Sequence, residues 1–199
     1  MKFIKENSYD IVKFFVYQIG IAVFSLTLAI PLEAAVDDKS DNIVQLFVSI
    51  LAVSFYCMLV YTVSWEHGAT ERIRIDAGKS ILDKFKGAKI ALVACMPNVI
   101  LSLVAIVASL LYAEGNAWNA VLGLLMAILG LIEAMYLGAV QFISTSLGNE
   151  ETVYLINSIC YLVFPFIIVF ASHLGYVFGD KNFRIFGFIP GKSNKKIKK

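Results

Sequence analysis

The chain carries one acidic side chain deep inside a long apolar stretch, that of Glu133. A charged carboxylate is costly in hydrocarbon, so such a group is either neutral or faces a partner or a water path. The polar side chains of Gln141, Asn98 and His173 also lie inside apolar stretches and would complete a site with it. The chemistry that this intramembrane polar site offers is the uptake and release of a proton or another small cation.

The alternative is a structural role for Glu133. A neutral carboxyl that hydrogen-bonds to one of four polar side chains would hold helices together without transport. These partners are Gln141, Asn98, Asn157 and His173. No second carboxylate and no basic side chain accompanies Glu133 in its apolar stretch, which favours the structural role.

Other residue types that carry chemistry do not form a site. Three cysteines, each inside an apolar stretch, are typical of small buried side chains rather than of a disulfide or metal set: Cys57, Cys95 and Cys160. His67 and His173 lie far apart and outside any metal-ligand pattern. Gly78-Lys79-Ser80 lacks the earlier glycine of a P-loop, since Ile73 stands there. We expect no catalytic residue, no cofactor and no metal, and the sequence argues against an enzyme.

Five long apolar segments would position these side chains. Hydrophobic residues make up 59% of the 199 residues and charged residues 16%. An average soluble domain is about half apolar and about a quarter charged. A helix that rises ~1.5 Å per residue needs about twenty apolar residues to cross ~30 Å of hydrocarbon. The sequence predicts an all-α, polytopic integral membrane helical bundle, a single domain over 1–199, with segments at about 11–35, 43–65, 91–112, 118–147 and 153–177.

The first segment has a second interpretation, a cleaved signal peptide, because it ends in the small residues Ala34-Ala35. Its apolar run is longer than the ~7–15 residues of a signal sequence, and Glu6 and Asp10 precede it. We expect an uncleaved span.

The connection between the second and third segments, residues 66–90, is polar and basic. Its basic residues are Arg72, Arg74, Lys79, Lys84, Lys86 and Lys89. A connection of this kind belongs on the cytoplasmic side. Membrane lipids and orientation explain its charge without nucleic acid. Ser80-x-x-Asp83 resembles a capping signal and predicts a short interfacial helix before the third segment.

The same loop contains four acids and three glycines, which membrane orientation does not require. Glycines there are better explained by defined turns. We therefore predict a contact with another membrane or cytoplasmic protein through a group of charged residues: Glu71, Arg72, Arg74 and Asp76.

The distribution of Lys and Arg bears on how segment 118–147 lies. If all five segments cross, the loop side holds nine basic residues and the other side eight, almost without bias. If this segment enters and leaves on one side, the counts become sixteen and one, as expected for a cytoplasmic loop. The small-residue ridge Gly130-xxx-Ala134-xxx-Gly138 favours a continuous helix instead. We favour four crossings plus one embedded or re-entrant segment, with the N-terminus, loop 66–90 and basic tail 178–199 cytoplasmic.

Six short motifs lie in the chain from Trp65 onward. They are Trp65-x-x-Gly68-Ala69, Arg74-x-Asp76-x-Gly78, Gly87-x-Lys89, Pro97-Asn98, Met135-Tyr136 and Gly175-Tyr176-x-x-Gly179. Together with the basic tail they resemble a group of uncharacterised small bacterial membrane proteins. The resemblance implies a bacterial inner membrane and no activity or ligand.

Two functional hypotheses follow. The first is a non-catalytic, permease-like or accessory membrane subunit whose cytoplasmic loop contacts a partner. The second is a self-contained channel or carrier with an intramembrane carboxylate site at Glu133. The first predicts that another protein co-purifies, and the second predicts transport by the purified protein alone.

Overall fold

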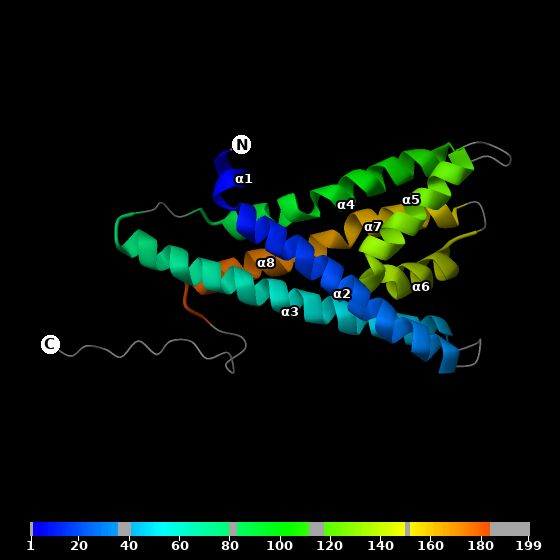
Figure 1. Ribbon diagram of the computed structural model, residues 1–199, viewed down its shortest axis with the longest axis horizontal. Helices are drawn as coiled ribbons and strands as arrows, with labels where there is room; N and C mark the ends of the chain where they lie inside the picture. Colours follow the sequence, from blue (N-terminus) through cyan, green and yellow to red (C-terminus); the bar gives the residue numbers. More distant parts are fainter. Residues whose placement is uncertain (1, 36–40, 80–82, 112–117, 150–151, 184–199) are drawn as a thin grey trace.

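The computed structural model describes residues 2–35, 41–79, 83–111, 118–149 and 152–183 (Figure 1). Its elements are α1 (Lys2–Glu6), α2 (Ser8–Ala35), α3 (Asp41–Asp76), α4 (Lys86–Leu110), α5 (Trp118–Ile132), the 3-10 helix η1 (Ala134–Tyr136), α6 (Leu137–Leu147), α7 (Val153–Val163) and α8 (Pro165–Asp180). Every regular element in these ranges is helical, so the predicted all-α fold is confirmed.

Four stretches of the described residues are helical, long and apolar enough to cross a membrane. They are Ser8–Pro31, Ile43–Asp76, Lys86–Leu110 and Val153–Asp180. In the last of these, α8 follows α7 after one residue and begins with Pro165, at a position where the missing N–H is tolerated. Helices α5 and α6 pass the same test only as a pair, which is bent by 88°. By length and composition the chain is a multi-pass membrane protein with four such helices, or five if the bent pair is one span.

The long helices pass back and forth along the bundle, α2 and α4 in one direction and α3 and α7–α8 in the other (Figure 1). The end of α3, the start of α4, α1 and the end of α8 share one end of the bundle, which we call the loop end (Figure 1). Two contacts show this arrangement: Arg72 of α3 lies 3.8 Å from the Asp180 carboxylate, and the Trp65 indole N–H donates to the Phe183 carbonyl at 2.7 Å.

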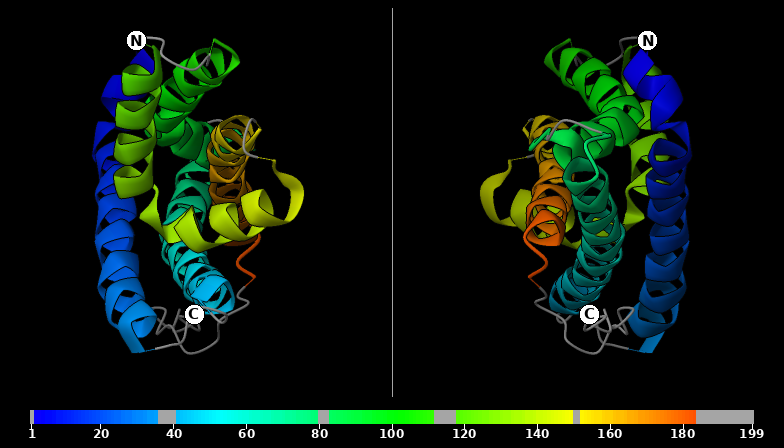
Figure 2. Two further views of the ribbon diagram at one scale, coloured as in Figure 1. Left: turned by 90° about the vertical axis from the view of Figure 1, so that its right-hand side faces the viewer. Right: turned by 90° about the vertical axis from the view of Figure 1, so that its left-hand side faces the viewer.

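Helices α5 and α6 form a V that begins and ends away from the loop end. α5 starts beside the end of α4, and α6 ends beside the start of α7, so both arms open at the same end (Figures 1 and 2). Four long passes plus one bent element are the arrangement that the count of basic residues favoured.

The predicted small-residue ridge is wrong, because the bend falls inside it. Gly130 belongs to α5 and Gly138 to α6, so the two do not share one helix face. Gly138 alone makes a close helix contact, where an added Cβ would overlap the backbone carbonyl of Gln45 on α3.

The polar connection predicted at 66–90 is largely helical in the described residues. α3 continues through the charged residues to Asp76, because Glu and Arg are good helix formers and do not end a helix. Gly78, with φ +71°, ends it, and the Lys79 N–H bonds the Arg74 carbonyl at 2.9 Å in a Schellman motif. α4 then begins at Lys86, so the described end of the predicted interfacial helix is part of α4. Ser80 to Leu82 lie outside the described residues.

Helices α3 and α8 approach each other closely over the half of the bundle nearest the loop end. Three glycines allow this, because a Cβ on any of them would overlap a backbone oxygen of the facing helix. These are Gly68 against Tyr176, Gly175 against Tyr61, and Gly179 against Trp65. Small residues at such positions are typical of helix contacts in membranes. We call this contact the glycine seam.

Candidate intramembrane site at the helix break

The bend between α5 and α6 is centred on Glu133. The Glu133 N–H makes the last bond of α5, to the Leu129 carbonyl at 2.8 Å, and the Glu133 carbonyl accepts from the Tyr136 N–H at 2.8 Å. Segment 118–147 contains no proline, so proline does not cause the break. The break therefore depends on contacts with other helices.

Polar side chains of α2 and α3 bond the backbone groups that the break frees. The Gln18 amide donates to the Ile132 carbonyl at 3.5 Å, and the Ser25 hydroxyl donates to the Ala134 carbonyl at 3.2 Å. The Ser49 hydroxyl accepts from the Gly138 N–H at 2.9 Å. Irregular backbone at membrane depth is stable only where such groups are satisfied inside the protein. Sequence analysis missed these three residues, although each is a polar side chain inside an apolar segment.

The Glu133 side chain itself is 0% exposed. Neither carboxylate oxygen has a hydrogen-bond partner among the residues that the structure describes. A structural role would need such a partner, so the described residues lend it no support, and the role of Glu133 stays a prediction. A buried carboxylate without partners is unfavourable when charged, and a bound cation or proton removes this cost.

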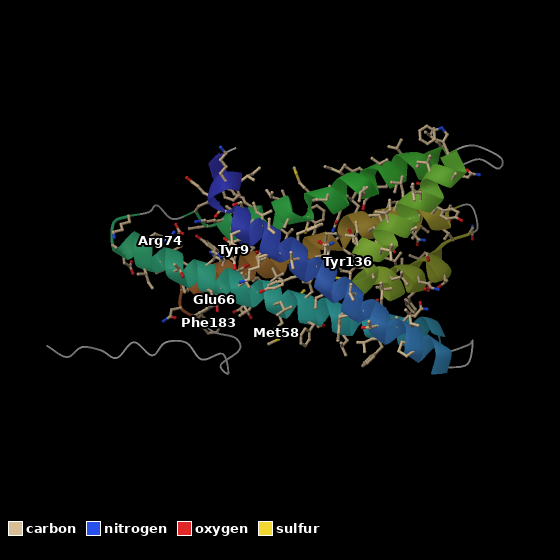
Figure 3. All side chains as sticks on the ribbon, in the orientation of Figure 1. Tyr9, Met58, Glu66, Arg74, Tyr136 and Phe183 are labelled. Carbon is tan, nitrogen blue, oxygen red and sulfur yellow. The ribbon has the colours of Figure 1, made fainter. Side chains whose placement is uncertain are left out.

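Four side chains from four elements lie within electrostatic reach of the Glu133 carboxyl. They are Tyr56 of α3, Cys95 of α4, Tyr136 of η1 and Tyr161 of α7. Tyr136 lies in the middle of the bundle (Figure 3), and its hydroxyl has no hydrogen-bond partner within the described ranges. The Tyr56 hydroxyl instead donates to the Phe14 carbonyl at 3.2 Å. None of these neighbours supplies a positive charge to balance the carboxylate.

Asn98, which the sequence predicted as a member of the site with Glu133, lies on the same buried face of α4 as Cys95. It is 1% exposed and follows Cys95 by one turn on the buried face of α4. Ser102 continues the same face one turn further. In the described part of the chain, the Asn98 amide oxygen and the Ser102 hydroxyl have no hydrogen-bond partner. The buried face of α4 therefore extends the polar site beyond the break.

The other two predicted members of the site are placed differently. Gln141 is half-buried on α6, two turns beyond the break, and neither oxygen of Glu133 bonds its amide. His173 stacks on Phe85, just before α4, with ring centroids 5.3 Å apart and an interplanar angle of 9°. The grouping of His173 with Glu133 is therefore wrong, because His173 lies toward the loop end.

The loop end holds a polar cavity of about 860 Å³ between the start of the chain, α3 and the start of α4. Two ion pairs lie in its wall. The His67 imidazole lies 2.8 Å from the Asp10 carboxylate, and the Lys86 ammonium lies 2.9 Å from the Glu71 carboxylate. Glu66 and Arg74 also line this cavity and lie on the part of α3 nearest the loop end (Figure 3).

The four residues predicted to contact a partner are largely engaged within the chain. Glu71 is 9% exposed and joins α3 to α4 through Lys86. Arg72 bonds Asp76 at 3.1 Å and reaches Asp180 of α8. Arg74 is exposed. Two of the four therefore connect helices of the same molecule.

No family model, no curated protein and no solved structure matches this chain. The resemblance to small bacterial membrane proteins stays a prediction. The fold and the site define a multi-pass helical membrane protein with a broken helix and a buried carboxylate at the break.

Proposed function

We propose that the protein is a self-contained channel or carrier for a small cation, and that Glu133 binds the ion. The observation that carries this proposal is the fully buried carboxylate at a helix break, with no partner for either oxygen among the described residues. Ionisable side chains and broken helices at membrane depth are how many transport proteins form their ion sites.

The break does not need a carboxylate for its own stability. Gln18, Ser25 and Ser49 already bond the backbone groups beside it. An apolar side chain at position 133 would avoid the desolvation that a carboxylate suffers there. The acidic group is therefore better explained by function than by folding.

The charge balance favours a monovalent cation. Glu133 brings one negative charge, and none of the four neighbouring side chains balances it. Across the described ranges, no group of three or more His, Cys, Asp or Glu residues has the geometry of a metal site. One positive charge would neutralise the site.

The accessory-subunit hypothesis has less support. It relied on charged residues of the loop facing a partner, and Glu71 and Arg72 are paired within the chain. Contact with another membrane or cytoplasmic protein remains a prediction for the exposed Arg74 and Asp76.

For the orientation, we propose that the loop end faces the cytoplasm of a bacterial inner membrane. In the sequence, the connections that follow α2, α4 and α6 together contain one of the seventeen basic residues, Lys39. Basic connections remain cytoplasmic. A reporter active only in the cytoplasm and fused after Lys199 should be active. Activity of a periplasm-only reporter at that position would contradict the orientation.

The test of function is cation flux through the purified protein in liposomes that contain ion-sensitive dyes. The parent protein should conduct or exchange a small cation, and Glu133→Gln should abolish this flux because Gln cannot bind a charge-balancing cation. Glu66→Gln is the matched control, since it makes the same chemical change at an exposed position on α3 and should keep full flux. Absence of flux from the parent protein would contradict a self-contained channel or carrier.

A further inference from the structure

The surroundings of Glu133 indicate which cation it binds, and this inference rests on the proposed function. We infer that Glu133 carries a proton, which reaches it along the Asn98–Ser102 face of α4 from the end where α5 and α6 open. Three features of the described residues support this: the use of the backbone carbonyls at the break, the neutral side chains around the carboxyl, and the polar atoms of α4.

The first feature concerns coordination. Metal cations in broken membrane helices are held largely by the carbonyls of the unwound backbone. At this break those carbonyls already accept hydrogen bonds, the Ile132 oxygen from Gln18 and the Ala134 oxygen from Ser25. The Leu129 and Glu133 carbonyls accept from backbone N–H groups. A sodium ion would have to share these oxygens with their present donors, whereas a proton needs a single carboxylate oxygen.

The second feature is the chemistry of the side chains within electrostatic reach of Glu133 and of those that bond the backbone beside it. α3, α4, η1 and α7 contribute Tyr56, Cys95, Tyr136 and Tyr161, which are phenols and one thiol. α2 contributes Gln18 and Ser25, which do not titrate. None of these groups takes a charge near neutral pH. Glu133 is then the group among them that changes protonation.

The third feature is a route. From Cys95, the buried face of α4 continues through Asn98 and Ser102 toward the end where α5 begins. Both carry a buried oxygen with no partner in the described chain. Buried polar atoms of this kind are commonly satisfied by water, and a file of water and side-chain oxygens conducts protons. Toward the loop end, by contrast, the glycine seam brings the α3 and α8 backbones into contact.

The test is infrared difference spectroscopy of the purified protein between acidic and alkaline buffers. A carbonyl stretch of a protonated, buried carboxyl should appear in the parent protein and be absent in Glu133→Gln. The band should be the same in sodium and in N-methylglucamine buffers. Loss of the band on adding sodium at constant pH would overturn the proton assignment while leaving the cation site intact. Absence of a Glu133 band at every pH would also overturn it.

The route is tested by the rate at which this band forms after a pH jump. The double variant Asn98→Leu, Ser102→Ala removes both oxygens while Leu keeps the branched shape of Asn, and it should slow the rate about tenfold, equivalent to ~1.4 kcal/mol in barrier height. Ser64→Ala is the control, because this buried serine bonds Ser172 across the glycine seam at 2.8 Å, and the rate should not change. If the double variant loses its fold, Ser102→Ala alone should still slow the rate. An unchanged rate in a folded variant would overturn the route.

This test is independent of the transport assay. A protein that shows the Glu133 band but no cation flux would retain the proton site and lose the proposed function. A protein with sodium flux that depends on Glu133 would retain the proposed function and lose the proton.

Discussion

The loop end and the helix break place carboxylates in opposite situations. At the loop end, Asp10, Glu71 and Asp76 each lie within 3.1 Å of a His, Lys or Arg nitrogen. At the break, Glu133 is more deeply buried, and neither of its oxygens has a partner in the described ranges. Pairing compensates for the burial of a charge. The most deeply buried of these four carboxylates is thus the one without a partner in the described ranges, which distinguishes Glu133 from the paired carboxylates of the loop end.

The backbone shows the same contrast in a different form. At the loop end the glycine seam brings two regular helices together, with no helix break in α3. At the break, side chains from α2 and α3 support an irregular backbone. At the break, the irregular backbone has its hydrogen bonds, and the Glu133 carboxylate has none in the described ranges. Under the proposed function, this side chain could therefore bind and release an ion while the backbone hydrogen bonds stay in place.

The largest effect on stability is expected in the glycine seam. Gly175→Ala adds a Cβ that overlaps the Tyr61 carbonyl, so it should lower the stability of the protein by about 1–3 kcal/mol through overpacking. Gly20→Ala is the matched control, because no atom lies within 4 Å of the added Cβ, and it should raise stability by about 0.5–1 kcal/mol. Melting temperatures in detergent measure both. Equal shifts for the two variants would mean that the seam is not closely packed.

The stability of the protein should rise when the carboxylate at the break is removed and fall when a side chain that bonds the backbone there is removed. Glu133→Leu removes an unpartnered buried carboxyl and should raise stability by about 1–3 kcal/mol. Ser25→Ala deprives the Ala134 carbonyl of its donor and should lower stability by ~1 kcal/mol. Thermal unfolding followed by circular dichroism measures both. A large loss of stability in Glu133→Leu would restore the structural role for Glu133.

Breaking an ion pair at the loop end should lower the stability of the protein more when the pair is buried than when it is exposed. Lys86→Met removes the ammonium from the nearly buried Glu71 and should lower stability by about 1–2 kcal/mol. Arg72→Met breaks a pair whose side chains are 51% and 62% exposed, and it should change stability by less than about 0.5 kcal/mol. The same melting experiment compares them, and a larger effect for Arg72 would show that its 3.8 Å contact with Asp180 contributes more to stability than the Lys86–Glu71 pair.

The smallest effect is a pH dependence at Asp83. The hydrogen bond from Lys89, at 2.8 Å, is the main reason that the pKa of Asp83 lies below its usual value. A lowered pKa in the folded state means that the pair adds stability above the ordinary Asp range and loses it as pH falls through the folded pKa. The small difference in melting temperature between parent and Asp83→Asn should therefore disappear in acid. A difference that persists at the lowest pH would show that the carboxylate charge is not involved.

Much of the fold could be predicted from the sequence, for reasons visible in particular residues. The apolar runs locate the long helices to within a few residues, except where α3 continues through Glu71 and Arg74 to the glycine at 78. Its position alone makes Glu133 a candidate site residue, since it is the one acid inside an apolar stretch. The count of Lys and Arg set segment 118–147 apart from the other four, and this segment is the one that is bent, by 88°.

The rest depends on contacts between segments that are distant in the chain. Gln18 bonds a carbonyl 114 positions away, and Ser49 bonds an N–H 89 positions away, and no local pattern predicts either contact. Segment 118–147 has no proline to mark the break, and the predicted small-residue ridge pointed to a continuous helix there. His173 was grouped with Glu133 because both are polar residues in apolar segments, and only the packing of α8 against the start of α4 separates them.

Under the proposed function, the carboxylate of Glu133 binds the transported cation. The most direct test compares flux through Glu133→Asp and Glu133→Gln in liposomes, with both variants confirmed to be folded. Asp keeps a carboxylate on a side chain one methylene shorter, whereas Gln keeps the length and loses the charge. We expect reduced but measurable flux through Glu133→Asp and none through Glu133→Gln. Equal flux through the two variants, or more through Gln, would contradict the claim.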